Sequence, residues 1–187
     1  VPLGILSAMG PRWLDGLIMR AADIGLAFPG LLLAIMFAAV FGASTTSAMF
    51  AIGLASVPSF ARVTRAGALG ILPREFITAA RVAGRRPASI GWHHVLPNVV
   101  GLVIVQASVS FALAILAEAG LSFLGFGTPP PTPSWGRMLQ ESQSLLASDP
   151  RLAIVPGVAI ALAVLGFNLL GDGLRDRFDP QMQVVDQ

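Results

Sequence analysis

Residues 99–121 read VVGLVIVQASVSFALAILAEAGL, and the whole run contains neither Lys nor Arg. A helix needs about 20 consecutive apolar residues to cross the hydrocarbon core of a bilayer, because lipid offers no partner for an unpaired backbone group. Residues 152–170 form a second run that is also free of Lys and Arg. Two further apolar runs, at about 24–42 and 48–69, are candidates to cross as well. The sequence therefore predicts an all-α, polytopic transmembrane helix bundle with four full spans.

The composition also favours a membrane over water. Hydrophobic residues make up 55% of the chain, the mean hydropathy is +0.76 and charged residues reach 12%, about half of the roughly 25% that is usual in soluble domains. The absence of Cys excludes disulfides, thiolate metal sites and thiol nucleophiles. The absence of Lys excludes a P-loop, so any hydrolysis of ATP must take place on another chain.

The distribution of arginine predicts how the spans are oriented, because loops on the cytoplasmic side retain positive charge. If loop 70–98 is cytoplasmic, an amphipathic stretch near 13–23 and the tail 171–187 are cytoplasmic too, and loop 122–151 is outside. Only Arg137 and Arg151 then lie outside. The arginines on the inner side are Arg12, Arg20, Arg62, Arg65, Arg74, Arg81, Arg85, Arg86, Arg175 and Arg177.

The cytoplasmic loop 70–98 is predicted to form two short helices around a sharp bend. Gly84 can adopt the left-handed conformation that ends the first helix, and Pro87 suits the first turn of the second. Pro97 is expected to end the second helix before the span 99–121 begins. A basic loop resting on anionic lipid headgroups is an alternative that these residues leave open. The first helix would have one apolar face, formed by Phe76, Ile77, Ala80 and Ala83 or Gly84.

The spacing inside this loop resembles the signature loop of ABC-importer permeases, which reads Glu-Ala-Ala, three residues, Gly, nine residues, Ile, one residue, Leu-Pro. Thr78 replaces the acidic residue of that signature, and His94 replaces the Ile. The resemblance implies a pair of coupling helices that dock on a separate ATPase. The residues that it assigns to docking are Thr78, Ala79, Ala80, Gly84, His94, Leu96 and Pro97.

Four other segments are similar to permeases of dipeptide, oligopeptide and nickel importers, of the second permease subunit type. They are residues 23–30 (DIGLAFPG), 118–127 (EAGLSFLGFG), 133–136 (PSWG) and 168–176 (NLLGDGLRD). The resemblance implies one permease domain over 1–187, with the bundle of a type I importer. Such permeases usually have six spans, so the apolar residues 1–6 are expected to be the remnant of a span whose start is missing.

The same resemblance implies a function and a set of partners. The chain would form half of the translocation pathway of an ATP-driven importer for peptides or a related small solute, with nickel as another candidate. It would work in the plasma (inner) membrane of a bacterium or archaeon, in contact with lipid. Its partners would be a second permease subunit, two ATP-binding subunits and an external substrate-binding protein. It would need no cofactor, bind no nucleic acid and catalyse no covalent step.

Several polar residues in the spans are candidates for the pathway. Glu118, near the outer end of the span 99–121, could line it together with Gln106, Ser108 and Ser110, since an ionisable group at membrane depth is costly without a cavity or partner. Glu118 could instead lie close enough to the interface to reach water or a donor in the outer loop. Asn168 is more typical of contacts between helices than of a substrate site.

Other classes of function have less support. His93 and His94 are adjacent, so on a helix they diverge by about 100° and no metal site is expected there. An intramembrane enzyme would need a catalytic partner for Glu118, and the spans contain none. A membrane-anchored basic scaffold or nucleic-acid binder would use the arginines at 62–86, where Phe76 is the only interleaved aromatic residue. The Pro-rich run 128–133 could be a stiff lid or a simple connector.

Three prolines lie inside the predicted spans or near their ends: Pro29, Pro58 and Pro156. Neighbouring helices can re-satisfy the carbonyls that a proline frees, so each proline is expected to mark a kink and not a break.

Overall fold

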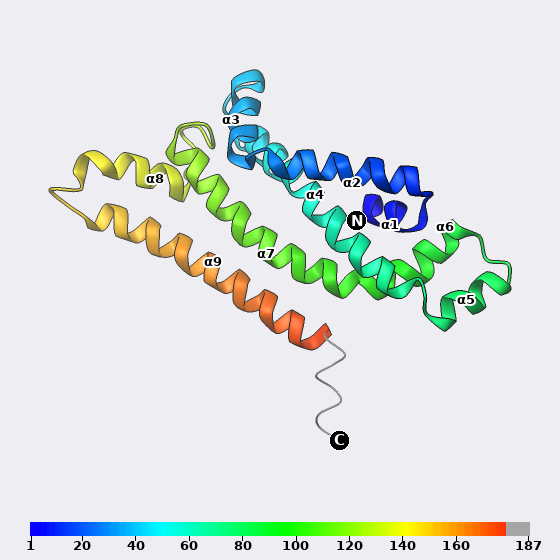
Figure 1. The fold of residues 1–187 in the computed structure, drawn as a ribbon. Helices are drawn as coiled ribbons and strands as arrows, with labels where there is room; N and C mark the ends of the chain where they lie inside the picture. The colour runs from blue at the N-terminus through cyan, green and yellow to red at the C-terminus, as the bar shows by residue number, and fades with distance from the viewer. Residues whose placement is uncertain (179–187) are drawn as a thin grey trace. The chain divides into compact units, whose positions relative to one another are not determined.

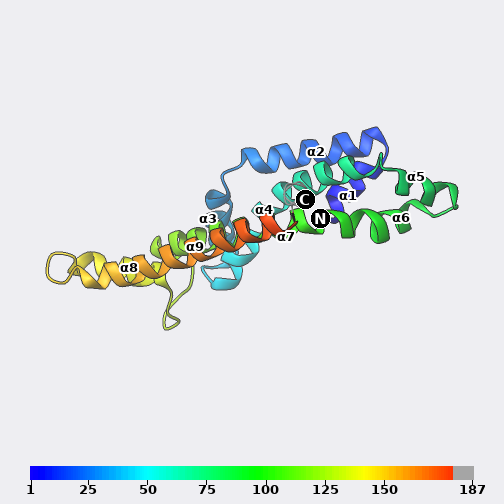
Figure 2. The ribbon, with the colours of Figure 1, turned by 90° about the horizontal axis from the view of Figure 1, so that it is seen from below.

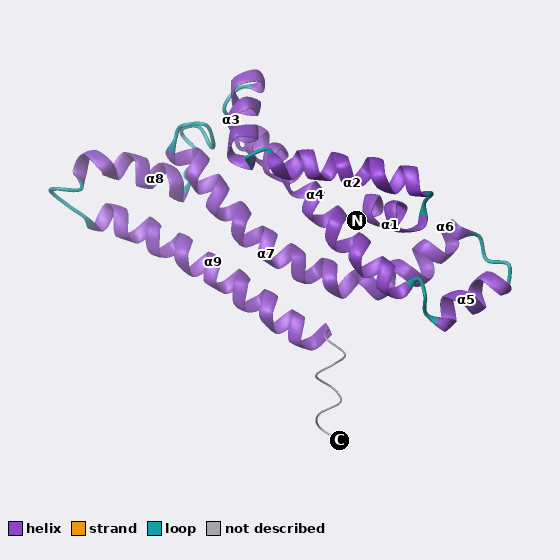
Figure 3. Ribbon diagram, in the orientation of Figure 1, coloured by secondary structure: helices purple, strands orange, loops and turns teal. Residues whose placement is uncertain are grey.

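The computed structural model describes residues 1–178, and within them the chain is helical with no strand (Figures 1 and 3). Residues 179–187, which belong to the predicted cytoplasmic tail, lie outside the described residues. The elements in order are α1 (Pro2–Met9), α2 (Arg12–Ala27), α3 (Gly30–Phe41), α4 (Thr45–Ile71), α5 (Glu75–Val82), α6 (Pro87–Ile90), a π-helical turn η1 (Gly91–Val95), α7 (Leu96–Phe123), α8 (Trp135–Ser142), a 3-10 turn η2 (Gln143–Leu145) and α9 (Arg151–Phe178).

Three helices are long and apolar enough to cross a membrane, at Thr45–Ile71, Pro87–Phe123 and Arg151–Arg177. They contain the predicted spans 48–69, 99–121 and 152–170 and extend beyond each of them. A bundle of apolar helices is therefore confirmed, and where each span begins and ends along its helix stays a prediction. Helices continue past the bilayer because solvated residues can remain helical; α9 ends with Arg175 and Arg177, whose positive charge suits the C-terminal end of a helix dipole.

The predicted span 24–42 is not one helix in the structure. It is divided between the end of α2 and α3, with Phe28 in a bend and Pro29 in an extended conformation (φ −61°, ψ 119°) before α3. A proline lacks the N–H that would continue the helix and disfavours a helical conformation at the residue before it. With its 12 residues, α3 alone is too short to cross, so α2 and α3 together form either one broken span or a re-entrant loop. The expectation of a mere kink at Pro29 was wrong.

By contrast, the helices continue through the two other prolines of the predicted spans. Pro58 lies inside α4 and Pro156 lies inside α9. Near Pro58, the Ser56 hydroxyl donates a hydrogen bond to the carbonyl of Ile52 (2.9 Å). The prediction that these two prolines do not break their helices is confirmed.

The chain divides into two compact units. Unit 1 contains α1, α2, the α4 residues from Val57, the α5–α6 region, the α7 residues as far as Ala107 and residues 171–178. Unit 2 contains Phe28–Ser56 and Ser108–Leu170. Because α4, α7 and α9 each contribute to both units, the division does not separate two successive domains along the sequence.

In unit 1, α2 packs antiparallel against the second half of α4. The Arg65 guanidinium donates two hydrogen bonds of 2.6 Å to the Asp15 carboxylate, and Arg62 pairs with Asp23. As the residue number rises on α2 it falls on α4, which defines the antiparallel arrangement. A Cβ on Gly25 would lie 2.8 Å from the Pro58 side chain, so a glycine permits the close approach at that level.

In unit 2, the first turns of α4 pack against α3 and the last turns of α7. Their buried core consists of Ala34, Ala48, Ala51 and Leu121. Phe111 on α7 stacks with Phe167 on α9, with ring centroids 5.6 Å apart. Small residues let these backbones approach closely, as is common between helices in membranes.

Candidate functional site

The predicted first helix of the cytoplasmic loop is α5, and its local sequence explains its ends. Arg74 precedes it in an extended conformation, and Glu75 in the first turn and Arg81 in the last turn both complement the helix dipole. Ile77 and Ala80 are buried, as the predicted apolar face requires. Phe76 does not belong to that face, because 41% of it is exposed. The buried face is therefore narrower than predicted.

Gly84 ends α5 as predicted, with a φ of +76°. The N–H of Arg85 donates to the carbonyl of Ala80 (3.1 Å), and the N–H of Gly84 donates to the carbonyl of Arg81 (3.0 Å). These two bonds form the Schellman motif. No atom lies within 4 Å of the position that a Cβ on Gly84 would occupy. The requirement for glycine is therefore set by the backbone conformation and not by crowding within the chain.

The second helix begins at Pro87, as predicted, but Pro97 does not end it. Helix α6 continues through the π-helical turn η1 into α7, so residues from Pro87 to Phe123 form one helical segment. The N–H of Leu96 bonds to the carbonyl of Gly91, and the Asn98 side-chain amide donates to the carbonyl of His94 (2.7 Å). The π-helical turn is wider than an α-helical one and lies just before Pro97, where the proline ring would otherwise crowd the carbonyl of His93. The expected stop at Pro97 was wrong for this reason.

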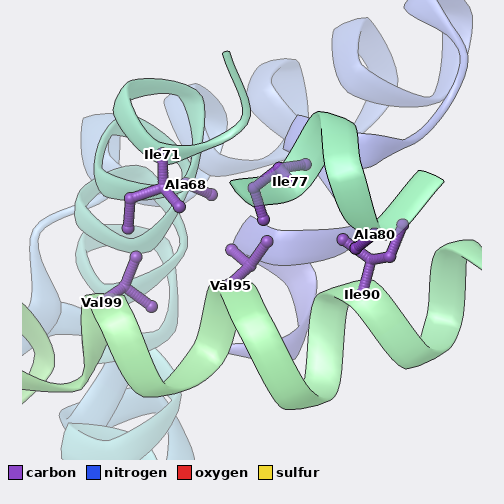
Figure 4. Close-up of a cluster of buried hydrophobic side chains, with 7 residues drawn as sticks. All are labelled: Ala68, Ile71, Ile77, Ala80, Ile90, Val95 and Val99. Atoms are coloured by element: carbon purple, nitrogen blue, oxygen red, sulfur yellow. The ribbon is translucent and has the colours of Figure 1, made fainter. Parts of the chain in front are cut away.

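A hydrophobic cluster fixes α5 to the ends of the two long helices beside it (Figure 4). Ile77, which is fully buried, and Ala80 point from α5 into the cluster. Burying an isoleucine side chain contributes about 1.5–3 kcal/mol. The cluster consists of Ala68 and Ile71 from α4, Ile77 and Ala80 from α5, and Ile90, Val95 and Val99 from the segment that leads into α7. It makes α5 a packed element, which a loop merely resting on headgroups would not require.

Helix α1 supports the same region from the other side. Ile5, Ala8 and Met9 of α1 pack against the cluster, and α1 lies beside the α5–α6 end of unit 1 in both views (Figures 1 and 2). The base of the bend is therefore held by α1, α4 and the start of α7 together.

The outer face of α5 is exposed and consists mainly of small residues. Thr78 and Ala79 are exposed, and Val82 is 86% exposed. These three residues lie at helical spacing on the side opposite Ile77. The surrounding arginines, Arg74, Arg81, Arg85 and Arg86, are exposed and belong to no ion pair within the described residues. The result is a small, flat surface with a cationic edge.

The structure does not place all seven predicted docking residues on this surface. Thr78, Ala79 and Gly84 are exposed, whereas Ala80 belongs to the core. The other three lie at the root of α7: Leu96 packs against the core, His94 is half-buried and Pro97 is exposed. Val82 also lies on this surface, and its spacing of four residues from Thr78 would have placed it there from the sequence.

Glu118, the candidate pathway residue, is hydrogen-bonded near the end of α7. Its Oε1 accepts from the Ser122 hydroxyl (2.6 Å) and from the Thr128 hydroxyl (3.1 Å). The backbone N–H of Thr128 donates to the Ser122 hydroxyl (2.9 Å), and the hydroxyls of Thr45 and Thr128 are 3.0 Å apart. This geometry matches the alternative in which Glu118 reaches donors from the outer loop.

The other candidate pathway residues lie earlier on α7. Ser108 is buried, while Gln106 and Ser110 are half-buried and one helical turn apart. Asn168 is exposed on α9. His93 Nδ1 lies 3.1 Å from the carbonyl of Ser89. Within residues 1–178 no group of three metal-ligating side chains comes together.

The start of the predicted outer loop and α8 lie against the end of α7. A Cβ on Gly136, in the first turn of α8, would lie 2.0 Å from the carbonyl oxygen of Ala119. Ser134 caps α8 by accepting from the N–H of Arg137 (3.2 Å). This part of the outer loop is therefore an ordered structure, which the polyproline run alone did not predict.

A family model covers almost all of the sequence. The model for the binding-protein-dependent transport system inner membrane component matches residues 1–184. The chain belongs to this family. As a member of a family of inner membrane components with several apolar helices, it is a multi-pass protein of the inner membrane.

Relatives of this inner membrane component are named as permeases. The dipeptide transport system permease protein DppC of Alkalihalophilus pseudofirmus is 45% identical over 181 residues, which is 97% of this chain and 60% of the relative. The glutathione transport system permease protein GsiD of Pectobacterium atrosepticum is 42% identical over the same shares. GsiD of Salmonella typhimurium is 43% identical over 91% of this chain and 56% of the relative. The chain thus spans about 60% of the length of these relatives, and the family describes a transport component, not an enzyme.

Proposed function

We propose that this chain is the membrane-spanning permease subunit of an ATP-driven importer for short peptides. Its relatives are named for dipeptide and glutathione transport, so their names favour peptides over nickel. The family belongs to binding-protein-dependent systems. The partners in this proposal are a second permease subunit, two ATP-binding subunits and an external substrate-binding protein.

The observation that supports coupling most directly is how α5 is packed. Its outer face is exposed and small, while its inner face belongs to a cluster with Ala68 and Ile71 of α4, Val95 of η1 and Val99 of α7. A displacement of α5 by an ATP-binding subunit would therefore push on two long helices at once. Because packed cores move as rigid bodies, the spans would shift together and alternate the side on which the pathway is open.

The pathway itself would be lined in part by α7. Gln106 and Ser110 present polar groups one turn apart, and Glu118 lies about 12 Å farther along the helix from Ser110. With Oε1 already bonded to two hydroxyls, Glu118 would act at the outer end, where the loop that contains Thr128 meets the helix.

Substitution of Gly84 tests the docking role. Gly84→Val places a β-branched residue at a φ of +76°, which costs roughly 1–3 kcal/mol, while Gly84→Asn keeps a residue that tolerates this conformation. We expect Gly84→Val to reduce both peptide uptake and co-purification of the ATP-binding subunit, and Gly84→Asn to retain most of both. The full-length protein should reach the membrane in either case. Normal uptake and co-purification with Gly84→Val would refute the assignment.

A further inference from the structure

The acidic and the basic residues of α2 differ in their partners. Its carboxylates, Asp15 and Asp23, pair with Arg65 and Arg62 of α4. Its arginines, Arg12 and Arg20, are exposed and belong to no ion pair within residues 1–178. Arg20 lies on the side of α2 opposite the buried Ala22, so the unpaired charge on that outward side is positive, although the helix as a whole is neutral.

Apolar side chains accompany Arg20 on that outward side. Trp13 is 70% exposed, Leu17 is 60% exposed and Ile24 is 73% exposed. At 100° per residue these three residues and Arg20 fall within an arc of roughly 60°. Ala22, on the other side, is buried. We call Trp13, Leu17, Arg20 and Ile24 the α2 stripe.

The pairing with α4 indicates the depth of the α2 stripe in the membrane. Asp15 lies level with Arg65, and Asp23 lies level with Arg62, so the stripe runs beside a band of paired charges at the end of a span. Such a band belongs in the headgroup layer, because charges in the hydrocarbon core are costly. Tryptophan and arginine are also the residues that favour this layer, where the indole lies at headgroup level and the guanidinium extends to phosphate.

We infer that the α2 stripe, together with Arg12, is a binding surface for anionic phospholipid headgroups. Arg20 and Arg12 bind the phosphates, Trp13 lies at headgroup level, and Leu17 and Ile24 insert among the upper parts of the acyl chains. Lipid suits this surface better than a partner helix. A partner helix would have to bury Arg20 between Ile24 and Trp13 and supply an acid to pair with it.

Quenching of tryptophan fluorescence by brominated lipid tests this inference. The full-length protein, with the subunits that co-purify, is placed in nanodiscs after Trp92, Trp135 and any tryptophan outside this sequence have been replaced by Phe, so that Trp13 is the only reporter. Brominated phosphatidylglycerol and brominated phosphatidylcholine are compared at equal mole fraction. We expect phosphatidylglycerol to quench Trp13 more strongly, with a local enrichment of about fivefold for each arginine.

Three variants make the test specific. Arg20→Gln should lower the enrichment by about fivefold, Arg20→Lys should retain it, and Arg151→Gln, which is exposed but lies far along the sequence from the α2 stripe, should not change it. Equal quenching by the two lipids would overturn the inference. So would the absence of quenching by either lipid, because Trp13 would then be covered by protein. Both of these outcomes are measured on the protein that retains Arg20, so the test remains decisive even if Arg20→Gln fails to accumulate.

Discussion

Ile77 and Val82 lie in the same short helix, but their environments are opposite. Ile77 is fully buried among residues of α4 and α7, and Val82 is 86% exposed. Ile77 therefore holds α5 in place, and Val82 is available to a partner. Replacing each of them by alanine separates stability from docking.

Ile77→Ala removes a buried side chain and should destabilise the protein by about 2–5 kcal/mol. Val82→Ala should change stability by no more than about 0.5 kcal/mol, because an exposed side chain has few contacts to lose. We expect Val82→Ala nevertheless to weaken co-purification of the ATP-binding subunit. Thermal unfolding of the purified variants and quantification of the bound subunit measure the two effects. A drop in stability of equal size for both variants would contradict this division of roles.

Two glycines near the outer end of α7 make a second contrast. A Cβ at Gly136 would lie 2.0 Å from the Ala119 carbonyl oxygen, whereas nothing lies within 4 Å of a Cβ at Gly120. Gly136→Ala should therefore unseat α8 and destabilise the protein by about 3 kcal/mol. Gly120→Ala should be neutral or stabilising by up to about 1 kcal/mol, since alanine is the better helix former. If thermal unfolding shows the same effect for both, the close contact of α8 with α7 does not exist in solution.

The pairing of α2 with α4 depends on two ion pairs of different exposure. The side chains of Arg65 and Asp15 are 30% and 27% exposed and form a two-point contact. Those of Arg62 and Asp23 are 50% and 58% exposed. Exposed pairs contribute little because water and salt screen them. The less exposed pair, Asp15 with Arg65, should therefore contribute most to the attachment of α2.

Double-mutant cycles measure this difference. We expect the coupling between Asp15→Asn and Arg65→Gln, read from thermal unfolding, to exceed the coupling between Asp23→Asn and Arg62→Gln. The coupling between Asp23 and Arg62 should also decrease more when the salt concentration is raised. A larger coupling between Asp23 and Arg62 would show that the antiparallel contact is strongest near Asp23 and not near Asp15.

Across the whole molecule, the sequence predicted what depends on local pattern. Long apolar runs, two of them without Lys or Arg, identified three helices. The left-handed bend at Gly84 and the start at Pro87 followed from the chemistry of those residues. What it missed depends on contacts between distant residues. The pairing of Asp15 with Arg65 spans 50 positions, and no periodicity within α2 points to it.

Proline was the least predictable residue, because its effect depends on its surroundings. The helix breaks at Pro29, passes through Pro58 and Pro156, and passes Pro97 with the help of a π-helical turn and the Asn98 side chain. The sequence shows the missing N–H in all four cases. It does not show whether a neighbouring group accommodates the loss.

Cross-linking tests most directly whether the outer face of α5 contacts the subunit that hydrolyses ATP. The sequence has no cysteine, so Val82→Cys, in a full-length protein cleared of any other cysteine, provides one reactive position on α5. Thr132→Cys, exposed in the outer loop, is the matched control. A short bifunctional reagent should join position 82 to the ATP-binding subunit and leave position 132 unjoined. Cross-linking of position 132 to that subunit would contradict this assignment of α5. So would the absence of a cross-link from position 82 in a transporter that still imports peptide.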